Sequence, residues 1–357
     1  MCRFLIILFF ISAQATAQTA VPFDSPRWKI EGEEAVKETH LNRPALRLKK
    51  GRALLTDANF RNGILEFDIA LKKARYFPAV QFRVQDDKNF EEYYLRPHQS
   101  GNPDAMQYTP VYNGLGGWQL YYGPGYNNAV QLPFDRWLHV RLMIKDKQAE
   151  VYFDNEEKPV LFIHELKREV TGGMIALANP YPETVWYSNV VYTPSDAVTI
   201  KSKPAPVTPL PESAIKEWAV SSLITEKSLQ NKMQLRPEDT TALSWKHLWA
   251  DANGITDLSV LTGITQDSNT VFVRKVIYAD QPGVKKLSFG FSDRAKVYLN
   301  NRLLYSGDDV FMSRDYRFLG TVGYWDALYL DLKKGRNELW IAVSETFGGW
   351  GVKAKLE

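Results

Sequence analysis

Apolar and polar side chains alternate along much of the first half of the chain, with the period of two that is typical of a β-strand with one buried face. The alternation is clearest in residues 63–71 (GILEFDIAL) and 78–85 (PAVQFRVQ). In the second segment we expect Gln81, Arg83 and Gln85 to project together, opposite three apolar side chains. Segments with a helical period are few, so the pattern predicts an antiparallel β-sandwich.

The segment NFEEYYLRPH, residues 89–98, continues this pattern with a face rich in hydrogen-bonding groups. If the whole segment is a strand, one face carries Phe90, Glu92, Tyr94, Arg96 and His98. The next residues, QSGNPDA, are typical of a loop, and Gln107, Thr109 and Asn113 are expected to return along the neighbouring strand. The sequence therefore predicts a strand, a loop and a strand that together form one wall of a groove.

Four prolines between residues 195 and 211 (SDAVTIKSKPAPVTPLP) interrupt the strand pattern. Proline at this density favours an extended conformation, so the segment is expected to be a semi-rigid linker. Beyond it, AKVYLNNRLLY predicts a hairpin with Asn300 and Asn301 in the turn, and residues 226–256 suggest a long loop or a short helix. The predicted fold class is all-β, with antiparallel β-sandwich (jelly-roll) domains over 22–194 and 212–357, joined by the linker 195–211.

The first residues, MCRFLIILFFISAQATAQ, have the charged, apolar and small-residue regions of a secretory signal peptide, with cleavage expected after Ala17. We therefore expect a secreted or periplasmic protein with residues 1–17 removed. The apolar run is too short to span a bilayer, and no later stretch has 18 consecutive apolar residues, so no membrane span is expected. The single cysteine, Cys2, lies in the leader, which excludes disulfides and cysteine metal sites in the mature chain.

Charge and aromatic content narrow the class of partner. The formal net charge of +3 falls by one when Arg3 is removed, and basic residues are scattered among acidic ones. This balance gives no electrostatic reason to expect nucleic acid or an anionic membrane as a partner. The chain has 10 Trp, 18 Tyr and 18 Phe, which suits both β-sheet cores and surfaces that stack on sugars.

The first domain resembles the concanavalin A-like lectin/glucanase sandwich, including its laminin-G-like and 3-keto-disaccharide-hydrolase-like relatives. The resemblance rests on RNGILEFDIAL, AVQFRVQDDKNFEEYYLRP, FDRWLHVRLMIKDKQAEVYFDN, TGGMIALANP and VWYSNVVYTP. It implies that a glycan binds on the concave face. The second domain resembles the galactose-binding-like jelly roll, through NNRLLY and KGRNELWIAV, well after residue 270 and loosely over 212–270. This second resemblance implies an accessory module.

A sugar site needs planar donors, amides and an aromatic platform, and the predicted groove offers all three. The expected ligand-binding residues are Gln81, Arg83, Tyr94, Arg96, Gln107, Asn113, Trp118 and Gln119. The alternative is that this polar face is only solvated. The leading hypothesis is an exported protein that binds a glycan or oligosaccharide. A cell-envelope module that binds another protein remains a second alternative.

Catalysis is the rival hypothesis, as a glycoside-processing hydrolase of the 3-keto-disaccharide-hydrolase-like type. Glu92 or Asp104 with His98 could form an acid/base couple for it. Glu66 and Asp68 resemble the first two carboxylates of the Glu-x-Asp-x-x-Glu strand of laminarinase-type glucanases, but Leu71 stands where the third carboxylate is expected. Glu66 and Asp68 are therefore expected to be exposed sheet residues.

Metal and cofactor sites have little support in the sequence. The five histidines, at 40, 98, 139, 164 and 247, are dispersed without metal-ligand spacing, and no cofactor is expected. A structural Ca²⁺ with oxygen ligands from Asn102, Asp104 or Asp86 and Asp87 remains open. In the second domain, Asp293 is expected to cap a turn and Trp350 to close the sandwich.

Overall fold

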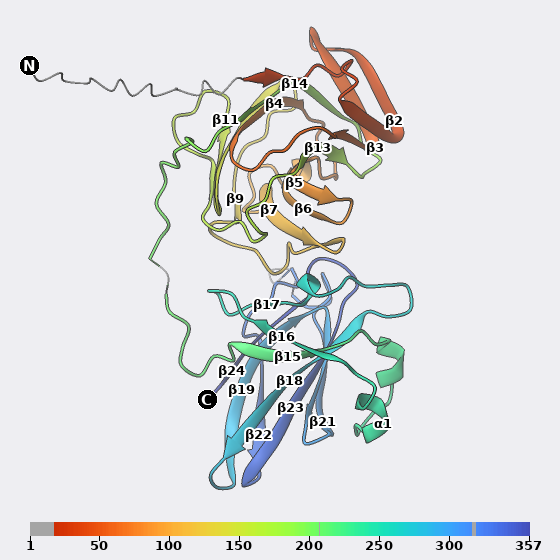
Figure 1. Cartoon of the computed structure of the whole chain (residues 1–357), viewed down its shortest axis with the longest axis vertical. Helices are drawn as coiled ribbons and strands as arrows, with labels where there is room; N and C mark the ends of the chain where they lie inside the picture. Colours follow the sequence, from red (N-terminus) through yellow and green to blue (C-terminus); the bar gives the residue numbers. More distant parts are fainter. Residues whose placement is uncertain (1–17, 207, 316–318) are drawn as a thin grey trace, which may run out of the picture.

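The computed structural model describes residues 18–206, 208–315 and 319–357, and it places two β-sandwiches one after the other along the long axis (Figure 1). Every strand pairing in both sandwiches is antiparallel, so the predicted all-β class is confirmed. The signal peptide predicted for residues 1–17 lies outside the described residues. Among the described residues, no helix has the length and apolar character needed to cross a bilayer.

The first sandwich is built from fourteen strands in the sheet order β12-β11-β10-β4-β14-β3-β13-β5-β6-β7-β8, with β1, β2 and β9 paired at its sides. The strands are β1 (Thr19–Ala20), β2 (Trp28–His40), β3 (Arg43–Leu55), β4 (Gly63–Ala70), β5 (Ala79–Asp86), β6 (Asn89–Leu95), β7 (Met106–Tyr112), β8 (Leu115–Gly116), β9 (Asn127–Asn128), β10 (Leu138–Lys145), β11 (Gln148–Phe153), β12 (Leu161–Ile163), β13 (Met174–Asn179) and β14 (Val185–Pro194).

The long strand β3 belongs to both halves of this sheet, because its first part pairs with β14 and its second part with β13. The sheet therefore folds over on itself and encloses one core. Leu65 and Phe67 of β4, Phe82 of β5 and Tyr93 of β6 all belong to that core. The alternation predicted for β4 is confirmed, because the polar side chains that alternate with these apolar ones lie on the outer face of the sheet.

The alternation predicted for β5 is wrong at Arg83. A β-bulge there, with φ of 50° at Arg83, shifts the pairing with β6. A bulge turns the following residues over to the other face. Arg83 is therefore 1% exposed, and its guanidinium donates to the carbonyls of Arg61 and Asp146 instead of lying beside Gln81.

The strand predicted over 89–98 is also shorter than expected. Strand β6 ends at Leu95, and a 3₁₀ turn, η1 (Pro97–Gln99), follows. Pro97 has no N–H to donate to the ladder, which explains the break. Arg96 and His98 therefore leave the strand, although Arg96 still reaches back to Tyr94.

The second sandwich packs a six-stranded sheet, in the order β16-β15-β18-β23-β20-β21, on a four-stranded sheet, in the order β17-β24-β19-β22. Its elements are β15 (Glu217–Ser221), η2 (Glu226–Leu229), α1 (Pro237–Thr240), β16 (Trp245–Trp249), β17 (Thr256–Asp257), η3 (Leu258–Val260), β18 (Thr270–Ala279), β19 (Gly283–Ser292), β20 (Arg294–Leu299), β21 (Arg302–Asp308), β22 (Asp326–Leu332), β23 (Gly335–Ser344) and β24 (Gly351–Leu356).

Three expectations for the second half are confirmed. Asn300 and Asn301, both with positive φ, form the turn between β20 and β21. Trp350 is fully buried, and the Asp293 carboxylate accepts hydrogen bonds from the Thr346 and Phe347 backbone N–H groups. The segment 226–256 contains the short helix α1, one of the two expected possibilities. It also contains strand β16, which was not predicted from the sequence.

The two sandwiches meet through the segment that follows β7. The Gln119 N–H donates to the Gly348 carbonyl at 2.8 Å, and Tyr121 donates to Asp257 at 3.0 Å. A Cβ added at Gly348 would lie 2.0 Å from Oε1 of Gln119, so glycine is required for this approach. The linker joins the sandwiches separately along one side (Figure 1), where the Glu150 carboxylate accepts the Lys201 and Ser202 N–H groups.

Candidate functional site

A hollow lies on the outer face of the first sandwich, over strands β3, β13 and β5. Register places Arg52 beside Ala178, and Ala178 beside Ala79, in one row across the sheet. Ala178 fills little space between longer side chains, and a cavity of about 350 Å³ opens beside it. Its lining includes Arg52, Gln81, Asp87, Phe90 and Ala178.

Gln81 and Glu92 form the polar centre of this face. They are paired across β5 and β6, and the Gln81 amide donates to the Glu92 carboxylate at 2.9 Å. The side-chain amide oxygen of Gln81 is buried and has no hydrogen-bond partner among the described residues. Burial raises the pKa of Glu92 above its ordinary value. This pair therefore has acceptor capacity that the protein itself leaves unused.

Arg52 supplies the complementary donors on the other side of the hollow. One of its terminal nitrogens pairs with Asp87 at 2.7 Å, and the guanidinium carbon lies 5.5 Å from the centre of the Phe90 ring. Its Nε and Nη2 atoms are buried and make no hydrogen bond to any described residue. Unsatisfied buried donors are uncommon in proteins and cost about 1–3 kcal/mol each. A bound ligand that accepts from them recovers that cost.

Aromatic rings border the same face. Phe77 packs against Tyr94 at 6.1 Å, Tyr181 at 4.7 Å and His98 at 5.3 Å between ring centres. Tyr181 is 38% exposed, so part of its ring is open to solvent. Sugar rings stack their C–H faces on exposed aromatic rings of this kind.

Arg96 and Gln107 lie beside these rings but are held by protein groups. Arg96 donates to the Tyr94 hydroxyl at 2.7 Å and to the side-chain amide oxygen of Gln107 at 2.6 Å. The Gln107 amide in turn donates to the Trp118 and Tyr121 carbonyls. The structure thus uses Arg96 and Gln107 to fix the start of the segment that contacts the second sandwich.

Asn113, Trp118 and Gln119 lie at the junction of the two sandwiches, away from the hollow. Asn113 donates to the Ser259 carbonyl at 2.8 Å, and Gln119 accepts from Ser292 at 3.2 Å. The Trp118 ring lies 5.7 Å from Phe311 and 6.2 Å from Phe347 of the second sandwich. These side chains have protein partners, and their predicted contact with a glycan stays a prediction.

The proposed catalytic set is not assembled into one group. Among the described residues, no hydrogen bond or ion pair joins Glu92, His98 and Asp104 to one another. Glu92 bonds to Gln81, and the backbone carbonyl of Asp104 accepts from Arg96. Burial is the main cause of the lowered pKa of His98. A catalytic role for this set stays a prediction.

A second polar cluster, centred on His139, was missed as a unit. His139 lies on the outer face, as expected, and its Nδ1 is 2.8 Å from the Asp68 carboxylate. The prediction that Asp68 is exposed is wrong, because its side chain is buried. Its Nε2 is 3.6 Å from Glu66. Asp68 also accepts from Arg43 and from Asn189 at 2.6 Å. The cluster could have been found only by pairing the Glu-x-Asp strand with the strand in WLHVRL. The sequence alone does not give the register between these two strands.

The two carboxylates determine the charge of this histidine. Hydrogen bonds to Asp68 and then Glu66 raise the pKa of His139 to about 9. The pKa values of both carboxyls are lowered, so the cluster holds an imidazolium between two carboxylates near neutral pH. An imidazolium cannot serve as a general base, so the cluster is suited to fastening the β2–β3 hairpin, through Arg43, to the sheet.

The described residues contain no group of three or more His, Cys, Asp or Glu placed to hold a metal ion. Asp86 accepts from the Lys88 N–H and from Asn89, and Asp87 pairs with Arg52. These contacts engage the Asp86 and Asp87 carboxylates, and Ca²⁺ binding by Asn102 or Asp104 stays a prediction.

Comparison with known proteins finds no matching protein-family model and no matching curated protein. Solved structures similar to about half of the chain include a carbohydrate-binding module, CBM66 from Bacillus subtilis, with 17% identity over 48% of this chain and 99% of that one and a TM-score of 0.37. Bacillus licheniformis β-glucanase has 12% identity, covers 51% of this chain and 100% of its own, and has a TM-score of 0.35. The exoplasmic/lumenal domain of VIP36, in a Ca²⁺/Man3GlcNAc-bound form, has 13% identity, coverage of 52% and 91%, and a TM-score of 0.35. These are distant likenesses that carry no conclusion about function.

Proposed function

We propose that this chain is an exported glycan-binding protein that holds an oligosaccharide in the hollow over β3, β13 and β5. The observation that carries the proposal is the set of buried, unpartnered polar atoms on Arg52 and Gln81 at a cavity floored by Ala178. We expect the Arg52 and Gln81 side chains to turn these buried atoms toward a hydroxyl-bearing ligand when it enters.

The chemistry of the face supports a sugar over other ligands. Arg52, which carries donors, and Gln81, which carries an acceptor, both line the cavity, and a sugar hydroxyl both donates and accepts. The exposed ring of Tyr181 offers a surface for the apolar C–H face of a sugar. The cavity volume of about 350 Å³ is within the usual range for small-ligand sites.

The geometry favours holding a glycan over cleaving it. Glycoside hydrolysis needs two free carboxyl groups on opposite sides of the scissile bond. Here Glu92 is hydrogen-bonded to Gln81, and Asp87 is paired with Arg52. The first sandwich therefore supports a binding role.

A glycan array with residues 18–357, followed by isothermal titration calorimetry on any hit, tests the proposal. Ala178→Leu fills the floor of the cavity and is expected to abolish binding. Gln81→Leu removes one hydrogen-bond acceptor and is expected to weaken binding about tenfold. Ala129→Leu makes the same change as the first variant at an exposed loop position, and should bind as the wild type does.

Two results would overturn the proposal. One is a folded wild-type protein that binds no glycan on the array. The other is an Ala178→Leu variant with a wild-type melting temperature and unchanged glycan affinity. Capture of one envelope protein without any glycan binding would instead support the protein-interaction alternative.

A further inference from the structure

The loop that follows β23, residues 345–350, packs closely against the first sandwich. The Gly348 carbonyl accepts the Gln119 N–H, and a Cβ added at Gly349 would lie 2.9 Å from Cγ of Leu120. The φ angles of Gly348 and Gly349 are 110° and 136°, which glycine adopts far more readily than other residues. The contact between the two sandwiches therefore depends on the shape of this loop.

Glu345 begins the loop, and its side chain is fully buried. Its backbone is fixed by Asn269, which accepts the Glu345 N–H at 2.9 Å and donates its amide to the Glu345 carbonyl at 3.0 Å. The carboxyl oxygen Oε1 accepts the Gly349 N–H at the long distance of 3.4 Å. The other oxygen, Oε2, is buried and has no hydrogen-bond partner among the described residues. A negative charge on this carboxyl is therefore poorly compensated for the water that it has lost.

Two further buried carboxyls, those of Asp293 and Asp257, face Glu345. Asp293 lies directly before β20 and accepts the Thr346 N–H of the same loop at 2.8 Å. Asp257 ends β17 and accepts the hydroxyl of Tyr121, from the first sandwich, at 3.0 Å. None of the three carboxyls has an ion-pair partner in the described part of the chain. Their negative charges would therefore repel one another across the junction.

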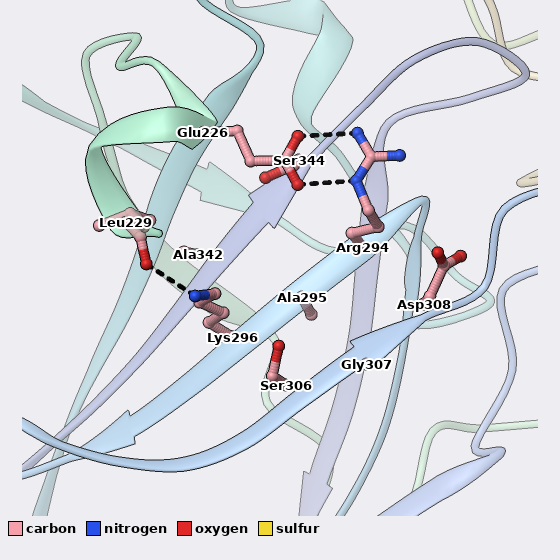
Figure 2. Close-up of a pocket in the computed structure, with 10 residues that line it drawn as sticks. All are labelled: Glu226, Leu229, Arg294, Ala295, Lys296, Ser306, Gly307, Asp308, Ala342 and Ser344. Atoms are coloured by element: carbon pink, nitrogen blue, oxygen red, sulfur yellow. Dashed lines mark hydrogen bonds and ion pairs between the residues drawn. The ribbon is translucent and has the colours of Figure 1, made fainter. Parts of the chain in front are cut away.

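The basic groups near these carboxyls are already paired with other acids. Arg294 faces Glu345, but its guanidinium forms two hydrogen bonds with Glu226, at 2.7 and 2.8 Å (Figure 2). Lys167 of the first sandwich is 2.8 Å from Asp251. The other titratable groups that face the cluster are Asp251 and Tyr112, beside Asp257, and Asp309, beside Asp293.

The junction therefore favours the protonated form of these acids. Burial raises the pKa of Glu345 well above its ordinary value, and the Asp293 and Asp257 carboxyls raise it further. Burial also raises the pKa of Asp257, to about 6. The resulting stabilisation of the closed junction is complete below the ordinary carboxyl pKa of about 4. It is lost as the pH rises through the raised pKa values, first that of Asp257 and then that of Glu345.

Ionisation of Glu345 requires water to reach its carboxylate. Because Asn269 holds the backbone of Glu345, the part of the loop that can move aside is the pair Gly348 and Gly349. That movement breaks the contact between Gly348 and Gln119. The linker still joins the sandwiches, so they separate at the junction without dissociating.

We propose that the 345–350 loop is a proton-controlled latch between the two sandwiches, closed when Glu345 and Asp257 are protonated and open when they are ionised. The latch goes beyond glycan binding, because none of its residues lines the hollow in the first sandwich.

Small-angle X-ray scattering of residues 18–357 at about pH 5 and about pH 9 tests the latch. The wild-type radius of gyration should be larger at the higher pH, with unchanged circular dichroism. Glu345→Gln keeps the size of the side chain and cannot ionise, so the increase should be lost. Asp257→Asn should make it smaller. Glu238→Gln removes an exposed carboxylate of α1 and should respond as the wild type does.

Two results would overturn the latch. One is a folded wild-type protein whose radius of gyration does not change between the two pH values. The other is a Glu345→Gln variant that opens at the higher pH as fully as the wild type. If Glu345→Gln does not fold, full opening of Asp257→Asn overturns the latch instead. A glycan array reports on the hollow alone, so its outcome leaves this test unchanged.

Discussion

The His139 cluster should make the stability of the first sandwich depend on pH in a defined direction. His139 contacts Asp68 and Glu66, and Arg43 and Asn189 face the same Asp68 carboxylate from β3 and β14. The informative perturbation is His139→Gln. It keeps a polar side chain of similar size and removes the titratable charge.

The sign and size follow from the pKa. The folded-state pKa of His139 is about 9, above the ordinary histidine value of 6.5. A raised pKa stabilises the fold fully below the unfolded pKa, and this contribution is lost as pH rises through the folded one. The shift alone corresponds to about 3 kcal/mol. Because 37% of the imidazole side chain is exposed, screening by solvent reduces the expected contribution to roughly 1–2 kcal/mol.

Urea unfolding of wild type and His139→Gln, compared between about pH 6 and about pH 10, measures this contribution. The stability advantage of the wild type should shrink by roughly 1–2 kcal/mol over that range, and most of the change should come above pH 7. The pKa values of Glu66 and Asp68 are lowered, so both stay ionised and add no slope there. Repeating the comparison in an Asp68→Asn background should remove most of the slope. An advantage that stays constant with pH would refute the reasoning.

Three further changes test other parts of the structure. Arg83→Met leaves the Arg61 and Asp146 carbonyls without a donor and should lower the free energy of unfolding by about 2–4 kcal/mol, measured by urea denaturation. Gly348→Val puts a side chain where Gln119 lies, so the sandwiches should separate; small-angle X-ray scattering should show a larger radius of gyration and unchanged circular dichroism. Glu150→Gln weakens two hydrogen bonds to the linker backbone and should speed trypsin cleavage after Lys201 about tenfold, followed by gel electrophoresis.

The layers of the first sandwich could be predicted because the alternation in β4 and β10 reports directly which face is buried. The break at Arg83 could not be predicted, because the bulge interrupts the alternation with no glycine or proline among the strand residues AVQFRVQ. The end of β6 could have been predicted from Pro97, which interrupts the ladder. The prediction instead extended the strand to His98, because the polar residues continue to that position. Local chemistry thus predicted the elements better than their exact ends.

The candidate hollow was predictable only in part. Gln81 and Glu92 were assigned to adjacent polar faces from alternation alone, and the structure pairs them. Arg52 and Ala178 could not be assigned to the hollow from the sequence. They are neighbours only because β3 pairs with β13, and these strands are far apart in the sequence. A hollow arises where small residues from distant strands fall in one row, and no single segment reveals that row.

The stretch from Asn113 to Gln119 shows why one sequence pattern fits two kinds of partner. Its amides and tryptophan were interpreted as part of a sugar site, and the structure places Gln119 and Trp118 against the Gly348 loop and Phe347. Both partners require the same features: planar hydrogen-bonding groups, an exposed ring, and a backbone that allows close approach. Alternation cannot distinguish them, because it reports only that a side chain leaves the core of its own sheet. The distinction comes from the partner side, where Gly348 has the positive φ and the missing Cβ that a buried Gln119 demands.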